Sequence, residues 1–138
     1  MRVPGLDFPW FALGDLGLEN IICLTSTACA PTPRFGVAHI PLYDLFGGGL
    51  PPDPRREEIS IHEAADVVLR WRRDGKGTVV HCAGGRGRTG TVLGVTLVKL
   101  GLDAEDAIRF LDSLHRRRGK PGWPESAWQA DVVRRAAR

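Results

Sequence analysis

The sequence predicts an α/β fold in which helices flank a central, mainly parallel sheet. The chain has 138 residues, a length that suits one domain with one hydrophobic core. Its apolar residues form short continuous runs, typical of buried strands, and these alternate with longer stretches of helical periodicity. Strands that alternate with helices favour a layered fold with a parallel sheet. We therefore expect residues 1–138 to form a single domain.

Three apolar runs are predicted as strands. Residues 20–24 read Asn-Ile-Ile-Cys-Leu, a run that suits a buried strand, with Cys23 as a small core residue. Residues 37–42 form the second strand, and the proline near its end indicates a strand terminus or an edge. Residues 78–81 form the third strand, which leads directly into Cys82.

Helices are predicted in the remaining periodic segments. Residues 57–74 form the first helix, which two glycines end. Residues 91–100 are nearly all apolar, so the second helix should be buried. Asp103 is expected to cap the third helix, and residues 125–138 form the last. The apolar stripe of the first helix consists of Ile61, Ala64, Ala65, Val68 and Trp71.

The segment between the second strand and the first helix is predicted as a loop. Residues 43–56 contain three consecutive glycines, at residues 47–49, and then the run Pro-Pro-Asp-Pro. Such a loop is long for a connection within a compact domain, and loops of this length are often functional.

A ten-residue run, His-Cys-Ala-Gly-Gly-Arg-Gly-Arg-Thr-Gly at residues 81–90, joins the third strand to the second helix. A bare Cys-x5-Arg match has about a one-in-three chance of arising here, and the flanking His, Gly, Thr and Gly lower that chance to roughly one in 10^5. A glycine-rich loop at a helix N-terminus presents backbone N–H groups that bind an oxyanion, and it favours a charged thiolate at Cys82. A phosphate held against a thiolate is the ground state of a cysteine-dependent phosphatase.

The His-Cys-x5-Arg-Thr pattern of residues 81–89 resembles the signature of the protein tyrosine phosphatase superfamily, and the chain looks most like its compact dual-specificity-like members. The resemblance implies a central sheet of about four or five strands. It also implies a metal-independent phosphomonoesterase, a tyrosine/dual-specificity phosphatase, that acts through a cysteinyl-phosphate intermediate. No cofactor and no metal are expected, because the loop N–H groups and an arginine supply the positive charge.

The residues of the run have distinct expected roles. Cys82 is the predicted nucleophile, and Arg88 is predicted to hold two phosphoryl oxygens with its planar guanidinium. Thr89 is expected to donate its hydroxyl to the Cys82 sulfur, and His81 is expected to order the loop by hydrogen bonding. The predicted phosphate-binding residues are Ala83, Gly84, Gly85, Arg86, Gly87 and Arg88.

In the phosphatases that this chain resembles, the general acid is an aspartate that precedes the run in the sequence. Asp44 follows the kind of Ile-Pro strand end at which similar small phosphatases carry that acid. Asp53 is the alternative, because its separation from Cys82 is nearer to the family's usual one, although it could simply form a turn before the helix. Gln129, near the start of the last helix, either positions the water that hydrolyses the intermediate, as in some relatives, or is an ordinary helix residue.

Composition and charge argue against several other classes of function. The net charge of +3 is modest and no aromatic residues interleave with the basic clusters, so no nucleic-acid partner is expected. No apolar run approaches ~18 residues and the first residues lack the apolar core of a signal peptide, so we expect no stable membrane insertion and a cytoplasmic location. The three cysteines lack disulfide or zinc-site spacing, and Cys29 is expected to be a bystander in a loop.

The expected substrate is a phosphorylated protein or a small phosphomonoester. A phosphoinositide is an alternative, because lipid phosphatases of the resembled superfamily place a lysine where Arg86 stands. A rhodanese-like sulfurtransferase also holds a cysteine in an anion-binding loop, but His81, Gly85 and the Arg-Thr-Gly ending argue against it. An inactive phosphoprotein-binding module is a further alternative, which would require the acid to be missing.

Overall fold

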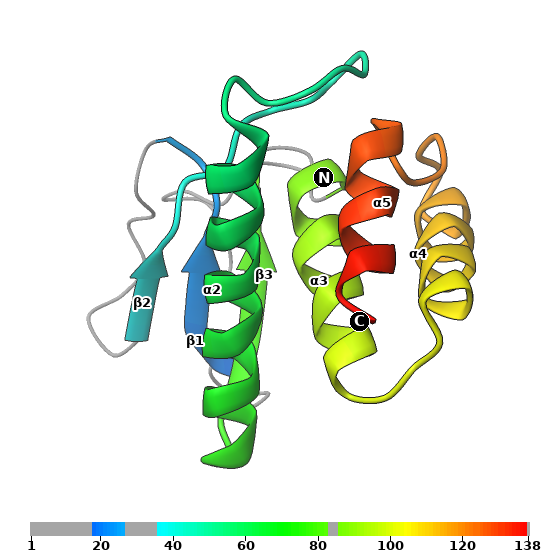
Figure 1. Cartoon of the computed structure of the whole chain (residues 1–138). Helices are drawn as coiled ribbons and strands as arrows, with labels where there is room; N and C mark the ends of the chain where they lie inside the picture. The colour runs from blue at the N-terminus through cyan, green and yellow to red at the C-terminus, as the bar shows by residue number, and fades with distance from the viewer. Residues whose placement is uncertain (1–17, 27–35, 83–85, 138) are drawn as a thin grey trace.

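The computed structural model of the chain describes residues 18–26, 36–82 and 86–137. The sheet in this part of the chain has three strands, all parallel, in the order β2–β1–β3. Together with the flanking helices (Figure 1), this arrangement confirms the predicted α/β class with a parallel sheet. The strands are β1 (Leu18–Cys23), β2 (Gly36–His39) and β3 (Gly77–His81).

The central strand β1 is enclosed on both sides. Ile21, Ile22 and Cys23 are fully buried, and Ile22 lies opposite Ala38 of β2 and Val80 of β3. A parallel strand that is covered on both faces requires a nearly continuous apolar run, which is the pattern the sequence shows here. The prediction of Cys23 as a small core residue is confirmed.

The helices of the described residues pack around α3. This helix contacts the other three helices and β3, and its many glycine, valine and threonine residues let those neighbours approach closely. In Figure 1, α2 lies in front of β1 and β3, while α3, α5 and α4 stand beside the sheet. The helices are α2 (Pro54–Arg73), α3 (Gly87–Lys99), α4 (Ala104–Arg117) and α5 (Ala127–Arg135).

The apolar stripe predicted for the helix after the long loop is confirmed in α2. Ile61, Ala64 and Ala65 are buried, and Val68 and Trp71 pack against the edge of the same core. Full burial of a side chain the size of Ile61 contributes roughly 1.5–3 kcal/mol to folding, and that of an alanine methyl less. The spacing of these residues at helical intervals therefore fixes which face of α2 lies against the sheet.

The structure corrects three expectations. The described residues hold three strands, not about four or five, because the chain after β2 enters an irregular loop and every element after β3 is a helix. The second strand ends at His39, earlier than predicted, because its pairing with β1 becomes irregular there: Ile40 N and Leu42 N donate to the consecutive carbonyls of Cys23 and Leu24, at 3.0 Å and 2.9 Å. The last helix begins at Ala127 rather than at residue 125, because Ser126 caps it.

The strand ends and helix starts that could form a site lie at one edge of the molecule. The carboxyl ends of the strands and the first turns of α3 and α5 lie at the upper edge in Figure 1, and the loop of residues 40–53 rises above that edge. Open parallel sheets bind ligands at the carboxyl ends of their strands, so this edge is where a site is expected. Among the described helices, none combines the length and the hydropathy that a membrane crossing would need.

Candidate active site

Cys82 directly follows β3 at the carboxyl edge of the sheet. Its Sγ accepts a hydrogen bond from Thr89 Oγ1 at 3.1 Å, and Cys82 is only 2% exposed. Thr89 lies in the first turn of α3, so the strand and the helix on either side of the loop meet at the sulfur. A hydroxyl donor in this position stabilises negative charge on sulfur.

Arg88 extends from the first turn of α3 toward the loop that follows β2. Its Nη1 donates to the Leu42 carbonyl oxygen at 3.4 Å, and its Nη2 lies 3.7 Å from Asp44 Oδ2. The Arg88 side chain is largely buried, whereas the Asp44 side chain is 57% exposed. The structure therefore brings Cys82, Thr89, Arg88 and Asp44 into one contiguous group. Thr89 contacts Cys82, and its chain neighbour Arg88 lies near Asp44.

The two candidate acids occupy different positions. Asp44 Oδ1 accepts from Phe46 N at 3.0 Å, which leaves its other oxygen facing Arg88. Asp53 is the N-cap of α2, and its Oδ1 accepts from Arg56 N at 3.2 Å. The geometry thus agrees with the turn interpretation for Asp53 and favours Asp44 as the carboxyl that reaches Arg88.

Glu57 of α2 contacts the loop that carries Asp44, a contact that the sequence did not predict. Its Oε2 accepts from Tyr43 N at 2.5 Å. Partial burial raises the pKa of Glu57 above its ordinary value, while the Tyr43 N–H and the positive charge of Arg88 oppose that rise. Glu57 therefore faces Arg88 and holds the residue immediately before Asp44.

The side chain of Arg86 is held by the segment that precedes α5. Its Nε donates to the Gly122 carbonyl at 2.7 Å, and its Nη1 lies 3.9 Å from Glu125 Oε2. The Glu125 side chain is itself only 10% exposed and packs against Gly87, where a Cβ would overlap the carboxylate. Glycine is required at residue 87 for this close approach, and Glu125 offsets part of the Arg86 charge.

Trp123 packs against the first turn of α3. Its Nε1 donates to the Gly87 carbonyl at 3.3 Å, and its ring lies so close to Gly90 that a Cβ there would come within 2.5 Å of Trp123 Cδ1. Trp123 is buried and belongs to the hydrophobic core. Gly87 and Gly90 of the run are thus explained by packing at least as much as by loop conformation.

Gln129 is part of a capping box at the start of α5. Its Oε1 accepts from Glu125 N at 2.9 Å and from Ser126 N at 3.3 Å, and the Ser126 hydroxyl in turn accepts from Trp128 N. The Gln129 side chain is buried, and its amide nitrogen lies beside Gly87. The structure therefore gives Gln129 a definite role in helix capping, next to the start of the run at Gly87.

The remaining predicted residues divide into two groups. His81 is buried at the end of β3, and its carbonyl accepts from Leu24 N at 3.0 Å, which ties the strand end to β1. Ala83, Gly84 and Gly85 lie outside the described residues, as does Cys29.

A cleft of about 300 Å³ opens beside Arg88 and Asp44. Phe46, which is 81% exposed, and Pro121 supply apolar walls, while Lys120 adds a positive charge at the rim. The cleft combines two guanidinium groups, one ammonium group and two carboxylates, a set that suits an anionic ligand. Its lining residues are Asp44, Phe46, Arg86, Arg88, Lys120, Pro121 and Glu125.

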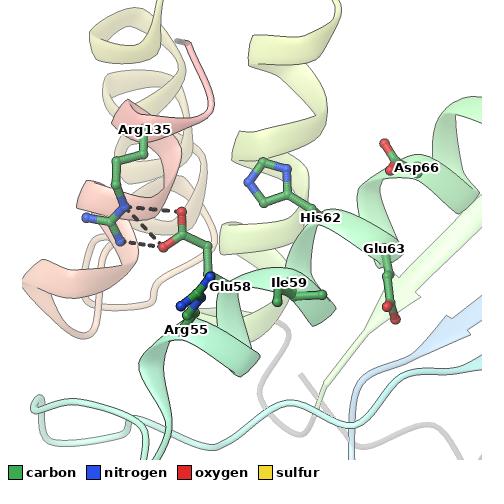
Figure 2. A pocket seen from close by; sticks show the side chains of 7 residues that line it. All are labelled: Arg55, Glu58, Ile59, His62, Glu63, Asp66 and Arg135. Atoms are coloured by element: carbon green, nitrogen blue, oxygen red, sulfur yellow. Dashed lines mark hydrogen bonds and ion pairs between the residues drawn. The ribbon is translucent and has the colours of Figure 1, made fainter.

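A larger hollow, of about 600 Å³, lies between α2 and the end of α5, apart from Cys82 (Figure 2). Figure 2 shows Glu58 and Arg135 in a bidentate ion pair, with Nη2 to Oε1 at 2.7 Å. His62 lines the same hollow, and burial together with the positive charge of Lys99 lowers its pKa. The hollow offers paired charges and no nucleophile, so we do not assign the chemistry to it.

Sequence reasoning missed Glu57 and Glu125. Glu57 contacts Tyr43 of the loop, and Glu125 lies 3.9 Å from Arg86 of the run, 39 positions earlier in the chain. Neither glutamate belongs to a motif, so nothing local in the sequence could have identified them.

Comparison with known proteins places this geometry in context. Residues 10–122 match the family model PTP-SAK, described as "Swiss Army Knife protein, DSP-PTPase phosphatase domain". The match spans most of the chain and includes the run at residues 81–90, and it confirms the resemblance predicted from that run.

Solved phosphatase structures share the fold. The crystal structure of DUSP15 is 17% identical, with a TM-score of 0.70, and covers 94% of this chain and 76% of that one. Tk-PTP in its active form is 23% identical, with a TM-score of 0.67 and coverage of 99% and 88%. PTPMT1 in complex with PI(5)P is 15% identical, with a TM-score of 0.68 and coverage of 99% and 86%. At these identities the likeness establishes the fold alone.

Proposed function

The chain belongs to the dual-specificity phosphatase family that carries this DSP-PTPase domain, and on that premise we propose that it is a cysteine-dependent phosphatase of phosphorylated proteins. The observation that carries the proposal is the contiguous group at the edge of the sheet. Thr89 reaches the Cys82 sulfur at 3.1 Å while its neighbour Arg88 lies 3.7 Å from Asp44. Nucleophile, anion holder and proton donor are the three groups that this reaction needs.

In the first step the phosphoryl group sits on the run of residues 82–88 and is held by Arg88. The Cys82 thiolate attacks phosphorus in line, so that an S–P bond forms as the P–O bond to the leaving group breaks. Asp44 gives its proton to the departing oxygen, which leaves as a neutral alcohol or phenol. Arg88 holds two equatorial oxygens through a bidentate fork as the transition state forms.

In the second step a water molecule attacks the phosphocysteine. Asp44, now a carboxylate, accepts a proton from that water, and the S–P bond breaks to release inorganic phosphate and restore the Cys82 thiolate. Thr89 stabilises the leaving thiolate through its hydroxyl. Gln129 borders the run through its amide nitrogen, which is compatible with a role in placing the water in addition to its capping role.

The decisive experiment measures hydrolysis of p-nitrophenyl phosphate in excess EDTA by the native chain and by Cys82→Ser. We expect turnover by the native chain and a loss of about 10^3-fold or more in the variant, because a hydroxyl is a much weaker nucleophile near neutral pH. If both proteins are inactive, the binding-module alternative replaces the enzyme. If both are active, the activity does not belong to Cys82.

The choice of acid is tested by Asp44→Asn and Asp53→Asn on phenyl phosphate, whose leaving group needs a proton. Asp44→Asn should lower kcat by about 10^2-fold or more. Asp53→Asn should change kcat little, and it is a matched control because asparagine caps a helix about as well as aspartate does. The opposite ranking would transfer the acid role to Asp53.

A phosphoinositide is the second candidate substrate. Lys120 and Arg86 line the cleft beside Arg88 and could meet a second phosphate, and PTPMT1, which shares the fold, was crystallised with PI(5)P. Against it, the Glu125 carboxylate already offsets part of the Arg86 charge. A panel of phosphotyrosine and phosphothreonine peptides and phosphoinositide vesicles separates the two. Hydrolysis of the vesicles alone would favour the lipid, and hydrolysis of both peptides would support dual specificity.

A further inference from the structure

The loop that carries Asp44 is fixed at its base by the sheet. Leu42 is buried, and its N–H donates to the Leu24 carbonyl at 2.9 Å. The Asp44 side chain is more than half exposed. Within the loop, its Oδ1 accepts a hydrogen bond from Phe46 N. The base of the loop is therefore rigid, whereas the position of the Asp44 carboxyl depends on what holds the residues next to it.

Two groups from different helices hold those residues. Arg88 of α3 donates to the Leu42 carbonyl at 3.4 Å and lies 3.7 Å from Asp44, and Glu57 of α2 accepts from Tyr43 N at 2.5 Å. Three consecutive loop residues, Leu42 to Asp44, are thus each fixed by a group outside the loop. The two holders also bear opposite charges and act on one another.

Arg88 cannot hold the loop and the substrate with the same hydrogen-bonding groups. When a phosphate dianion enters the run, the guanidinium has a stronger partner than the Leu42 carbonyl or the Asp44 carboxylate. Glu57 is not among the residues that line the cleft, so its hydrogen bond from Tyr43 N can persist while a phosphate is bound. Glu57 is therefore the anchor that remains when Arg88 turns to its substrate.

We infer that Glu57 is the positioning residue for the general acid: by accepting the Tyr43 N–H, it keeps the Asp44 carboxyl over the leaving-group side of the cleft while Arg88 binds phosphate. This inference rests on the proposed function. Glu57 touches neither the substrate nor the reacting atoms. Partial burial raises its pKa, so its charged form depends on the Tyr43 N–H and on Arg88, the two groups whose placement it serves.

The neighbouring residue, Glu58, is a carboxylate in the same turn with a purely structural contact. Glu58 points away from the loop and forms a bidentate ion pair with Arg135 of α5 (Figure 2). The two glutamates are adjacent near the start of α2. Glu58→Gln is therefore a matched control that removes a carboxylate from the same turn without touching the acid loop.

The test compares two substrates whose leaving groups differ in their need for a proton. p-Nitrophenolate is weakly basic and leaves without help, whereas phenolate is strongly basic and needs the acid. We expect Glu57→Ala to lower kcat for phenyl phosphate by about tenfold or more and kcat for p-nitrophenyl phosphate by less than about threefold, with KM little changed. Glu57→Gln keeps an amide oxygen that can accept from Tyr43 N, so it should recover most of the loss.

The double variant Asp44→Asn with Glu57→Ala completes the test. If Glu57 acts through Asp44, the double variant should be no slower on phenyl phosphate than Asp44→Asn alone. Equal losses on both substrates for Glu57→Ala, or a Glu58→Gln variant with the same leaving-group dependence, would overturn the inference. Far-ultraviolet circular dichroism establishes the folded fraction. If Glu57→Ala fails to fold, Glu57→Met carries the test, because methionine has a similar length but no oxygen to accept from Tyr43 N.

The outcomes separate this inference from the proposed function. An inactive native chain, or an active Cys82→Ser, would overturn the phosphatase mechanism itself. A native chain and an Asp44→Asn variant that behave as proposed, together with a Glu57→Ala variant that shows no leaving-group dependence, would overturn the role of Glu57 alone.

Discussion

At the scale of single residues, the hydroxyl of Thr89 has the most direct link to the sulfur of Cys82. It donates to Sγ at 3.1 Å, within a part of the protein that is buried. Hydrogen bonds to charged groups contribute about 1.5–3 kcal/mol, and this one gains strength whenever the thiolate is released. Thr89 should therefore matter most in the second chemical step.

Thr89→Ala should slow breakdown of the phosphocysteine by about 10- to 100-fold, because the leaving thiolate loses its donor. Rapid mixing with p-nitrophenyl phosphate should then show a burst of p-nitrophenolate close to the enzyme concentration, followed by a slow steady state. Thr96→Ala is the control, since Thr96 Oγ1 donates to the Val92 carbonyl at 2.8 Å in the middle of the same helix. A Thr89→Ala variant without a burst and with an unchanged rate would contradict the assignment.

At the scale of elements, the position of α3 depends on a residue without a side chain. A Cβ on Gly94 would lie 2.7 Å from Val133 Cγ2 and 3.1 Å from Leu111 Cδ1, so α5 and α4 pack directly against the α3 backbone. Contacts this close hold the first turn of α3, and with it Arg88 and Thr89, at a fixed distance from the sheet.

Gly94→Ala should destabilise the fold by about 1–2 kcal/mol. Alanine gains up to about 1 kcal/mol in helix propensity, but overpacking a closed interface costs about 1–3 kcal/mol. Urea unfolding followed by circular dichroism measures the net change. Ser113→Ala, on the exposed side of α4, gains propensity without a clash and should leave stability equal or slightly higher. A more stable Gly94→Ala variant would show that the helices can move apart without loss.

The elements differ in how far the sequence could predict them. The continuous apolar run of β1 and the helical stripe of α2 were both recognisable, because burial imposes a period on the sequence. The end of β2 and the start of α5 were not, because they depend on the irregular pairing after His39 and on the hydrogen bonds of Ser126, which decide single positions rather than a pattern.

At the scale of the whole molecule, stability should depend on the charge state of a buried histidine. Burial lowers the pKa of His115, and the guanidinium groups of Arg118 and Arg86 and the ammonium group of Lys120 add to the effect, while Asp112 opposes it. The folded protein therefore binds this proton less readily than the unfolded chain does. The associated stability is present at a pH above about 6.5, the ordinary value for histidine, and is lost as the pH falls below it.

We expect the native chain to lose more stability between pH 7.5 and 5.5 than His115→Gln does, in urea unfolding at each pH. Comparing the two proteins cancels other groups that titrate in or near this range, including His62, whose lowered pKa acts in the same direction, and Glu57, whose raised pKa acts in the opposite one. Parallel stability curves for the two proteins would contradict the assignment to His115.

The sequence by itself identified the run at residues 81–90, the strand before it and the helix after it, because a motif and its flanking elements are continuous in the chain. It also limited the candidates for the proposed general acid to Asp44 and Asp53. Only the tertiary structure showed that Asp44 lies beside Arg88, that Asp53 caps α2, and that Glu57 accepts a hydrogen bond from Tyr43 N. Arg88 and Leu42 are 46 positions apart, and a contact at that separation depends on how the sheet and helices pack rather than on any local pattern.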